Sequence, residues 1–284
     1  MKKYIFPGLL AIITFLMTIF VNGTWSFNEI NQLYIFGDSL SDVGNTAKLT
    51  ESQYPPTPPY FSGRFSNGPL WVEYLAKDLN LNSDQVTNLA WGGATTKGNV
   101  GNIPGLLTQV KRFANTNPTV NSGALAVIWI GANDYLYGTT NVKIPVDNMV
   151  EAIFILVQTG IKNFLIVNLP DLGQLPATRT NDISASLSAL TKAHNLYLSQ
   201  TIQRLDQDLD SDIEIVEFDV YSLYKDVINH PDKFGLKNVT KNCLNQKVIC
   251  EHPENFLFWD SLHPSAVAHQ ILGEKAFEKV QNTL

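Results

Sequence analysis

The chain has 284 residues, of which 44% are hydrophobic and 16% are charged, and its formal net charge is −6. This composition can bury a sizeable core and excludes a disordered chain. The negative charge argues against a general nucleic-acid binder, which needs a basic surface, and gives no broad electrostatic attraction to anionic membranes.

The first 26 residues are typical of a secretory signal peptide. Lys2 and Lys3 precede an apolar run over residues 4–21, and small or polar residues follow. The alternative is an uncleaved membrane anchor, because the run approaches the ~20 residues that span a bilayer. We expect cleavage, which leaves residues 27–284 as one exported domain, either extracellular or periplasmic.

Apolar strands alternate with amphipathic helices along the rest of the chain. Strands are predicted over residues 33–36, 86–89, 125–130, 164–167 and 213–218. Helices are predicted over residues 70–79, 106–113, 146–158, 184–205 and 265–280. This β-α-β-α order indicates an α/β protein, in which a parallel sheet of about five strands has helices on both faces. In open sheets of this kind the active site lies beyond the carboxyl ends of the strands.

A serine follows the first predicted strand directly. Ser39 lies two residues after Gly37, and we expect it to begin a helix. Its hydroxyl would then be presented at the edge of the sheet, and its N–H and the helix dipole would stabilise a developing oxyanion. The alternative is a serine that only caps a helix.

Two further loops follow predicted strands. Gly92 and Gly93 come after the second strand, and a glycine pair lets the backbone approach a ligand closely. Asn133 comes after the third strand, and its side-chain amide can donate a hydrogen bond to an oxyanion. The alternatives are an ordinary tight turn for the glycines and a helix cap for the asparagine.

Asp260 and His263 lie just before the last predicted helix. A serine nucleophile needs an adjacent base, usually histidine, and a carboxylate fixes the tautomer of the imidazole. Residues three positions apart can reach one site from a single turn. The alternative is a helix-capping aspartate beside a surface histidine. Neither an HExxH motif nor a Cys/His cluster is present, so we expect no metal and no other cofactor.

The two cysteines lie close together late in the chain. In an exported protein, Cys243 and Cys250 are expected to form a disulfide, and the alternative is two free thiols in a flexible loop. They belong to a segment of weak periodicity, residues 234–255, just upstream of Asp260. We hypothesise that this segment is a disulfide-closed lid or regulatory loop over the active site.

Together these motifs resemble the GDSL lipase/esterase family, also called SGNH hydrolases. The resemblance implies a three-layer sandwich with a flavodoxin-like sheet. It also implies a catalytic triad of Ser39, His263 and Asp260. The oxyanion hole would be formed by the Ser39 N–H, the Gly93 N–H and the Asn133 amide, with the preceding glycine as the fallback for Gly93.

Three strings resemble the bacterial phospholipase/lecithinase/hemolysin branch, which includes the glycerophospholipid–cholesterol acyltransferases. They are residues 36–45 (FGDSLSDVGN), residues 63–68 (GRFSNG) with Trp71 just after, and residues 258–260 (FWD). This resemblance implies a secreted ester hydrolase that acts on phospholipids or lysophospholipids. A sterol as acyl acceptor and a transient contact with a membrane surface are further implications.

Aromatic residues flank the predicted catalytic loops, and we expect them to form an apolar wall for an acyl chain, although core packing is an equally common role. They are Trp91, Tyr135, Tyr137 and Trp259. A short-chain or carbohydrate esterase is the nearest alternative function. A catalytically silent, exported lipid- or glycan-binding protein on the same fold is a remote one.

Overall fold

The computed structural model describes residues 30–117 and 119–284, and the predicted signal peptide lies outside the described residues. Five strands form one parallel sheet in the order β2-β1-β3-β4-β5. They are β1 (Gln32–Gly37), β2 (Val86–Asn88), β3 (Ala124–Trp129), β4 (Asn163–Val167) and β5 (Glu214–Phe218). The predicted strands and the predicted flavodoxin-like α/β class are confirmed.

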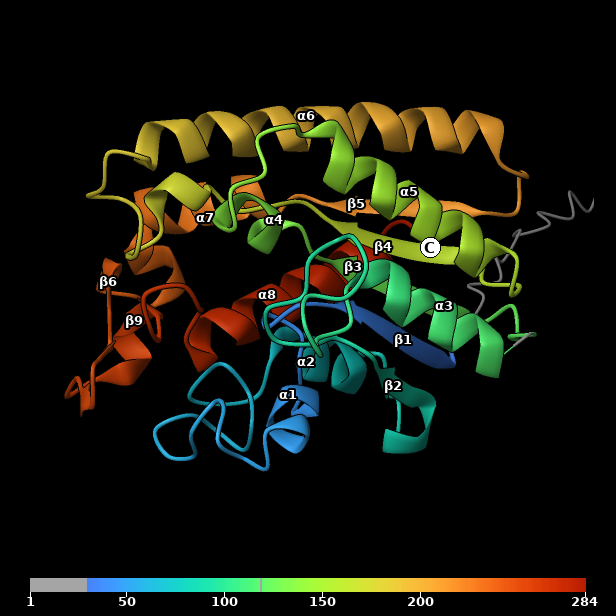
Figure 1. The fold of residues 1–284 in the computed structure, drawn as a ribbon. Coiled ribbons are helices and arrows are strands. Elements are labelled where there is room, and N and C mark those ends of the chain that lie inside the picture. Colours follow the sequence, from blue (N-terminus) through green and yellow to red (C-terminus); the bar gives the residue numbers. More distant parts are fainter. Residues whose placement is uncertain (1–29, 118) are drawn as a thin grey trace, which may run out of the picture.

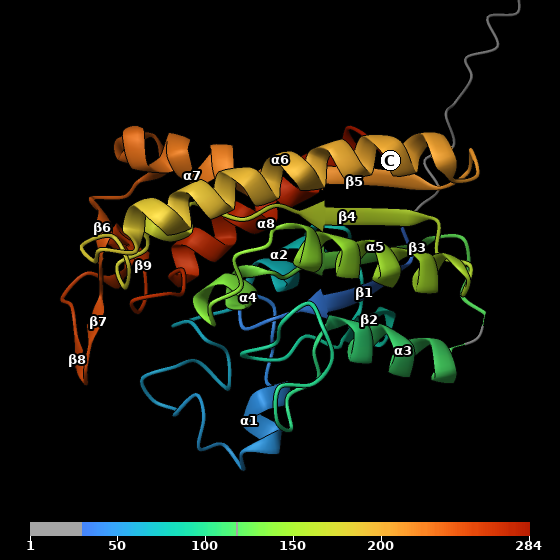
Figure 2. The same ribbon diagram turned by 45° about the horizontal axis from the view of Figure 1, so that its top comes forward.

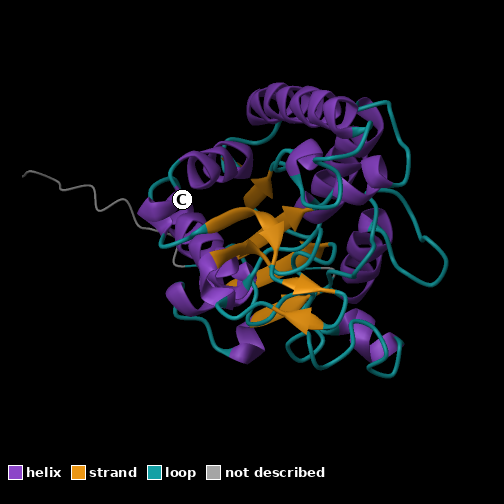
Figure 3. Ribbon diagram, turned by 90° about the vertical axis from the view of Figure 1, so that its left-hand side faces the viewer, coloured by secondary structure: helices purple, strands orange, loops and turns teal. Residues whose placement is uncertain are grey.

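Helices cover both faces of this sheet, which lies in the middle of the molecule (Figures 1 and 3). One face packs against α3 (Leu106–Thr116), α5 (Lys143–Val157) and α6 (Ser184–Asp208). The other packs against α2 (Trp71–Asp78), α7 (Val220–Asn229) and α8 (Ala266–Gln281). All except α7 were predicted.

The central strand β3 shows why the sequence reads as one apolar run. Its side chains alternate between the two cores: Leu125 and Val127 face one, and Ala126 and Ile128 face the other. All six residues of β3 are fully buried. A strand covered on both faces has no polar side, so its sequence shows no alternation.

Several short elements were not predicted. The first helix, α1 (Asn45–Leu49), and α4 (Ala132–Leu136) each have only five residues. Single-turn 3-10 helices occur at Ser83–Gln85, Leu172–Gln174, Pro231–Phe234 and Pro253–Asn255. Such segments are too short for a period of 3.6 residues to be visible.

A second unpredicted group, near the C-terminus, comprises a two-stranded sheet, called the accessory sheet, and a separate hairpin. Strand β6 (Asn238–Asn242) pairs in parallel with β9 (Phe256–Phe258), and β7 (Leu244–Asn245) forms a hairpin with β8 (Val248–Ile249). The predicted disulfide is formed in this region: Cys243 and Cys250 are bonded, with their Cα atoms 4.9 Å apart.

The accessory sheet lies beyond the carboxyl ends of the main strands. In Figure 2 the arrowheads of β1 and β4 point toward the side where α4, β6 and β9 are found. The loops that follow the main strands and those of the accessory sheet therefore meet at one edge.

Across the described residues, no helix combines the length and apolarity needed to cross a bilayer.

Candidate active site

Ser39 lies in a tight turn directly after β1. The prediction that a helix begins at Ser39 is wrong, because the next helix, α1, begins at Asn45. Asp38 holds the turn instead: its side chain accepts the N–H of Leu40 (3.0 Å) and its carbonyl accepts the N–H of Ser41 (3.1 Å). No described residue accepts the N–H of Ser39, which therefore remains available to a ligand.

The end of β1 is fixed by a buried glutamine from the neighbouring helix α3. Gln109 accepts the N–H of Gly37 (3.0 Å) and donates to its carbonyl (2.9 Å). Gln109 is itself only 1% exposed. Since both backbone groups of Gly37 are engaged, the turn that carries Ser39 starts from a rigid point.

Ser39, His263 and Asp260 form a continuous chain of contacts. Ser39 Oγ lies 2.9 Å from His263 Nε2, and His263 Nδ1 lies 2.8 Å from Asp260 Oδ2. The Asp260 carboxylate also accepts the N–H groups of Leu262 and His263, both at 2.8 Å. These hydrogen bonds within the turn hold it rigid. A spacing of three residues is therefore sufficient to bring both side chains to Ser39.

Charge pairing sets the pKa values of Asp260 and His263. Burial alone would raise the pKa of Asp260, but the charge of His263 and several hydrogen bonds outweigh it and lower the pKa to about 2. Burial would lower the pKa of His263, but the charge and hydrogen bond of Asp260 outweigh it and raise the pKa. The carboxylate is thus ionised across the neutral range and stabilises a protonated imidazole.

The two glycines after β2 have different roles. The N–H of Gly92 donates to Asp42 Oδ2 (2.9 Å) and Thr46 Oγ1 (2.8 Å), so it is not available to a ligand. Gly93 has a φ of +79°, a conformation that favours glycine, and none of the described residues accepts its N–H. The fallback to the first glycine is therefore disfavoured, and Gly93 is the residue with a free donor.

Asn133 lies in α4, just after β3. Its side-chain nitrogen donates to the carbonyl of Ala94 at 2.9 Å, which orients the amide and leaves one hydrogen free. Tyr135, also in α4, connects this helix to the core, because its hydroxyl lies 2.8 Å from Nδ1 of the buried His194. Burial lowers the pKa of His194 to about 4, so this support is neutral at physiological pH.

Residues 63–71 connect the Ser39 turn to the His263 turn. Ser66 donates to the carbonyl of Pro264 (2.9 Å), and the side chain of Asn67 accepts the N–H of Ala266 (2.8 Å). At the other end, the indole of Trp71 donates to Ser41 Oγ (3.1 Å). The string that resembles the family motif therefore fixes the separation of the two turns.

Two aromatic contacts in the site were not predicted. The ring of Phe65 packs on the imidazole of His263, with centroids 5.2 Å apart, and Tyr60 donates to Asp260 Oδ2 at 2.7 Å. Phe65 belongs to a quoted motif, whereas Tyr60 ends a proline-rich loop 200 residues away from Asp260. No local pattern links those two positions.

The cavity beside Ser39 has a volume of only about 40 Å³. Aliphatic side chains from several loops, together with Tyr224, form much of its wall: Leu40, Leu136, Leu172, Leu175 and Leu262. None of the four aromatic residues expected as an apolar wall lines this cavity, and core packing, the alternative, holds for three of them. Trp259 and Tyr135 are buried in cores, and Trp91 packs against another core.

Tyr137 differs from the other three aromatics in having an exposed side chain. It is 62% exposed, and a Cβ placed on Gly93 would lie 3.4 Å from its hydroxyl. The segment proposed as a lid, residues 234–255, supplies no residue to the wall of the cavity beside Ser39. Its hairpin packs instead on Trp259, next to Asp260 in the chain.

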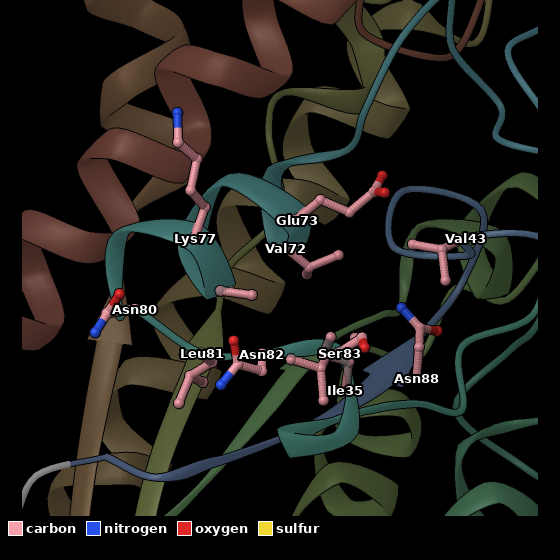
Figure 4. Close-up of a pocket in the computed structure, with 12 residues that line it drawn as sticks. Ile35, Val43, Val72, Glu73, Lys77, Asn80, Leu81, Asn82, Ser83 and Asn88 are labelled. Carbon is pink, nitrogen blue, oxygen red and sulfur yellow. The ribbon is translucent and has the colours of Figure 1, made fainter.

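Larger cavities lie elsewhere. One of about 280 Å³ shares Leu175 and Tyr224 with the wall of the small cavity. Another, of about 470 Å³, lies between α2 and β2 and is shown in Figure 4. Its wall includes Glu73 and Lys77 but none of the candidate catalytic residues, so its size does not mark the reacting centre.

In the described part of the chain, no three His, Cys, Asp or Glu side chains are arranged to hold a metal ion.

Comparison with known proteins identifies the family. The model of the family described as GDSL-like lipase/acylhydrolase matches residues 33–276. The phosphatidylcholine-sterol acyltransferase of Aeromonas hydrophila is 26% identical over 322 residues, covering 92% of this chain and 93% of that protein. The thermolabile hemolysin of Vibrio parahaemolyticus is 27% identical over 281 residues, covering 90% of this chain and 65% of the hemolysin.

A solved structure supports the same fold. The inhibitor-bound form of an aryl esterase from M. smegmatis superimposes with a TM-score of 0.51 at 17% identity, covering 89% of this chain and all of that one. At this identity the likeness concerns the fold alone.

Proposed function

The chain belongs to the GDSL-like lipase/acylhydrolase family of carboxylic ester hydrolases, and on that premise we propose that it hydrolyses phospholipids or lysophospholipids through an acyl-enzyme on Ser39. The observation that carries the proposal is the contact of Ser39 Oγ with His263 Nε2 at 2.9 Å, backed by Asp260 at 2.8 Å. A serine becomes nucleophilic when an oriented base lies within hydrogen-bonding distance.

Each residue has a defined step. His263 removes the proton of Ser39, whose oxygen attacks the ester carbonyl. The N–H groups of Ser39 and Gly93 and the amide of Asn133 donate to the oxyanion. His263 then gives its proton to the leaving alcohol, and a water molecule activated by His263 releases the fatty acid. If a sterol or other alcohol takes the place of water, the acyl group is transferred to it.

A lipid substrate is supported by a relative and by the walls of the cavities. One relative bears the name phosphatidylcholine-sterol acyltransferase. Leucine side chains dominate the cavity beside Ser39, and the cavity of about 280 Å³ lies on the other side of Leu175 and Tyr224. Movement of those two side chains would join the cavities and lengthen the space open to an acyl chain.

A short-chain or carbohydrate esterase is the second candidate, and the size of the site favours it. A cavity of about 40 Å³ has room for a small acyl group but not for a fatty acyl chain. The two candidates therefore differ in whether Leu175 and Tyr224 move when substrate binds. Measuring turnover of esters with increasing acyl chain length distinguishes the two candidates directly.

We also propose export, with residues 1–26 as a cleaved signal peptide and residues 27–284 as a single domain. The disulfide between Cys243 and Cys250 supports an oxidising compartment, because structural disulfides are rare in the cytosol. The described residues contain no free cysteine, which agrees with this compartment.

The test measures acyl release by residues 27–284 from phosphatidylcholine, lysophosphatidylcholine and p-nitrophenyl esters of increasing chain length. Ser39→Ala should lower kcat by several orders of magnitude, since the members of a triad act as a unit. Ser186→Ala, which removes an exposed hydroxyl on α6, is the matched control and should retain full activity.

Each outcome decides one part of the proposal. Turnover of phospholipids that vanishes in Ser39→Ala supports both mechanism and substrate class, and turnover of short esters alone supports the second candidate. If Ser39→Ala is as active as the unmutated protein, the mechanism is wrong. Labelling of Ser39 by a fluorophosphonate excludes a catalytically silent binding protein, because only an activated serine reacts.

A further inference from the structure

The carboxylate of Asp260 has one partner from outside its own turn. Its Oδ1 atom accepts the N–H groups of Leu262 and His263, both at 2.8 Å. Its Oδ2 atom accepts the hydroxyl of Tyr60 at 2.7 Å. Among the described residues outside the turn 260–263, Tyr60 is the only one that bonds to this carboxylate.

Tyr60 is itself held independently of His263. Its N–H donates to the carbonyl of Pro56 (3.1 Å) within the proline-rich loop, residues 54–60. Its ring meets the indole of Trp259 edge-on, with centroids 6.4 Å apart and planes at 85°. The hydroxyl therefore reaches Asp260 from a ring with its own fixed position.

Trp259, the residue on which Tyr60 packs, is held by the disulfide hairpin. It is 2% exposed and lies in a small core with Cys243 and Leu244. The backbone N–H of Leu244 donates to the carbonyl of Trp259 at 2.6 Å, and that of Cys243 donates to the carbonyl of Phe258 at 3.0 Å. The hairpin and the proline-rich loop thus meet on the residue that directly precedes Asp260.

We propose that Tyr60 is a positioning residue for catalysis, which fixes the plane of the Asp260 carboxylate and thereby the orientation of His263. This inference rests on the proposed triad. The terminal torsion of an aspartate is soft and nearly two-fold. Without Tyr60, the one bond to Oδ2 from the described residues would come from His263, the ring that has to be oriented. With Tyr60 on Oδ2 and the backbone on Oδ1, both oxygens are restrained and the imidazole meets a fixed acceptor.

Tyr60 also affects the charge of the pair. Burial and the charge of Asp260 raise the pKa of Tyr60, so its hydroxyl remains a donor throughout the working pH range. A donated hydrogen bond withdraws negative charge from the carboxylate. Without it, Asp260 would hold a protonated His263 more tightly, and the pKa of His263 would rise further.

The variant Tyr60→Phe tests this, because it keeps the ring on Trp259 and removes only the hydroxyl. We expect kcat on a p-nitrophenyl ester to fall about 10- to 100-fold, the range for losing a hydrogen bond to a charged group, with little change in KM. We also expect the acidic limb of kcat/KM to move to higher pH. Tyr197→Phe is the matched control: it removes a hydroxyl that donates to a carboxylate at the surface, that of Asp147 (3.0 Å), and should retain activity.

The pH profile must be compared between variants, because other titratable groups surround the pair. Asp38, Tyr54 and His269 each interact electrostatically with Asp260 or His263. Tyr60→Phe leaves these groups in place, so a displaced acidic limb reports the changed charge of Asp260. The thermal midpoint of each variant shows whether it remains folded.

The outcomes separate this inference from the proposed function. If Tyr60→Phe matches the unmutated protein in kcat and pH profile while Ser39→Ala is inactive, the triad stands and the positioning role is wrong. If Tyr60→Phe loses activity only as far as it loses thermal stability, with an unmoved acidic limb, Tyr60 is structural and the inference fails. If Ser39→Ala retains activity, the proposed function fails first.

Discussion

The two halves of the candidate site are supported in different ways. The nucleophile half, β1 and the turn 38–41, is part of the five-stranded sheet, and β1 is paired on both sides by β2 and β3. The acid–base half, β9 and the turn 260–263, is carried by a strand of three residues whose one partner strand in the described part of the chain is β6. Main-chain pairing in a buried sheet holds Ser39, whereas side chains, a hairpin and a disulfide hold Asp260 and His263.

This difference predicts which half of the site opens more easily by local unfolding. Local opening is governed by buried apolar contacts and by protected backbone hydrogen bonds, and the nucleophile half has far more of both. The halves are joined by residues 63–71, which bond to Ser41 at one end and to Pro264 and Ala266 at the other. We therefore expect changes in the acid–base half to alter geometry and charge, and changes in the nucleophile half to alter mainly the stabilisation of the oxyanion.

The largest effect in the acid–base half is expected from Asp260→Asn. Asparagine cannot stabilise the imidazolium and favours the wrong tautomer, so kcat should fall about 10⁴-fold. Because Asp260 raises the pKa of His263, the acidic limb of residual activity should move to lower pH. Ester hydrolysis measured across pH checks both, with the exposed Asp78→Asn as the control. A loss of less than tenfold would contradict a triad.

The nucleophile half should respond to Asn133→Ala with a smaller loss. Removing one donor to an oxyanion lowers kcat about 10²- to 10³-fold. Since the amide carries no charge, the acidic limb of the profile should stay where it is, in contrast to Asp260→Asn. Steady-state measurement of kcat on the same ester, repeated across pH, checks both expectations. An unchanged kcat would remove Asn133 from the oxyanion hole, leaving the N–H groups of Ser39 and Gly93.

The disulfide offers a direct comparison of the two halves. Replacing Cys243 and Cys250 by serine should lower the free energy of unfolding by about 2–3 kcal/mol, as expected for a short loop. Hydrogen exchange should quicken at the amide of Trp259, whose carbonyl bonds to Leu244, and at that of His263 in the turn that follows, but not at Ile35 in β1. Equal quickening in both places would show that the halves are one cooperative unit, and the comparison would fail.

The sequence predicts the nucleophile half far better than its counterpart. Short apolar runs bounded by glycines, such as residues 125–130, indicate buried strands, and the residues after them were expected at the edge of the sheet. The polar strand β6 (Asn238–Asn242, sequence NVTKN) has no such pattern, because it is stabilised by its pairing with β9. The contact between Tyr60 and Asp260 depends on tertiary structure alone.

Two errors have local causes. Ser39 was expected to begin a helix because it directly follows a buried strand, but Asp38 accepts the N–H groups of Leu40 and Ser41 and forms a turn instead. The aromatic wall was expected because these residues are close to the catalytic ones in sequence. However, Trp259 packs in the small core with Cys243, and Tyr135 contacts His194. A residue next to a catalytic position in the chain often faces away from it, since successive side chains alternate in direction.

Asp38 gives the smallest expected effect and links the two halves through charge. Burial raises its pKa to about 7 from 3.8, so the folded state binds a proton more tightly than the unfolded chain, and ionisation opposes folding as pH rises from about 4 to about 7. Asp38→Asn cannot ionise and should be more stable than the unmutated protein at pH 8, by about 1–2 kcal/mol, because a buried amide retains part of the cost.

At pH 4 the unfolding free energies of Asp38→Asn and the unmutated protein should converge, since both side chains are then uncharged in the fold; urea unfolding at the two pH values checks this. The charge of Asp38 also raises the pKa of His263, so the variant's acidic limb should move slightly to lower pH. A constant stability difference at both pH values would show that Asp38 does not titrate in this range. If the acidic limb also stays in place, His263 takes its charge environment from the acid–base half alone.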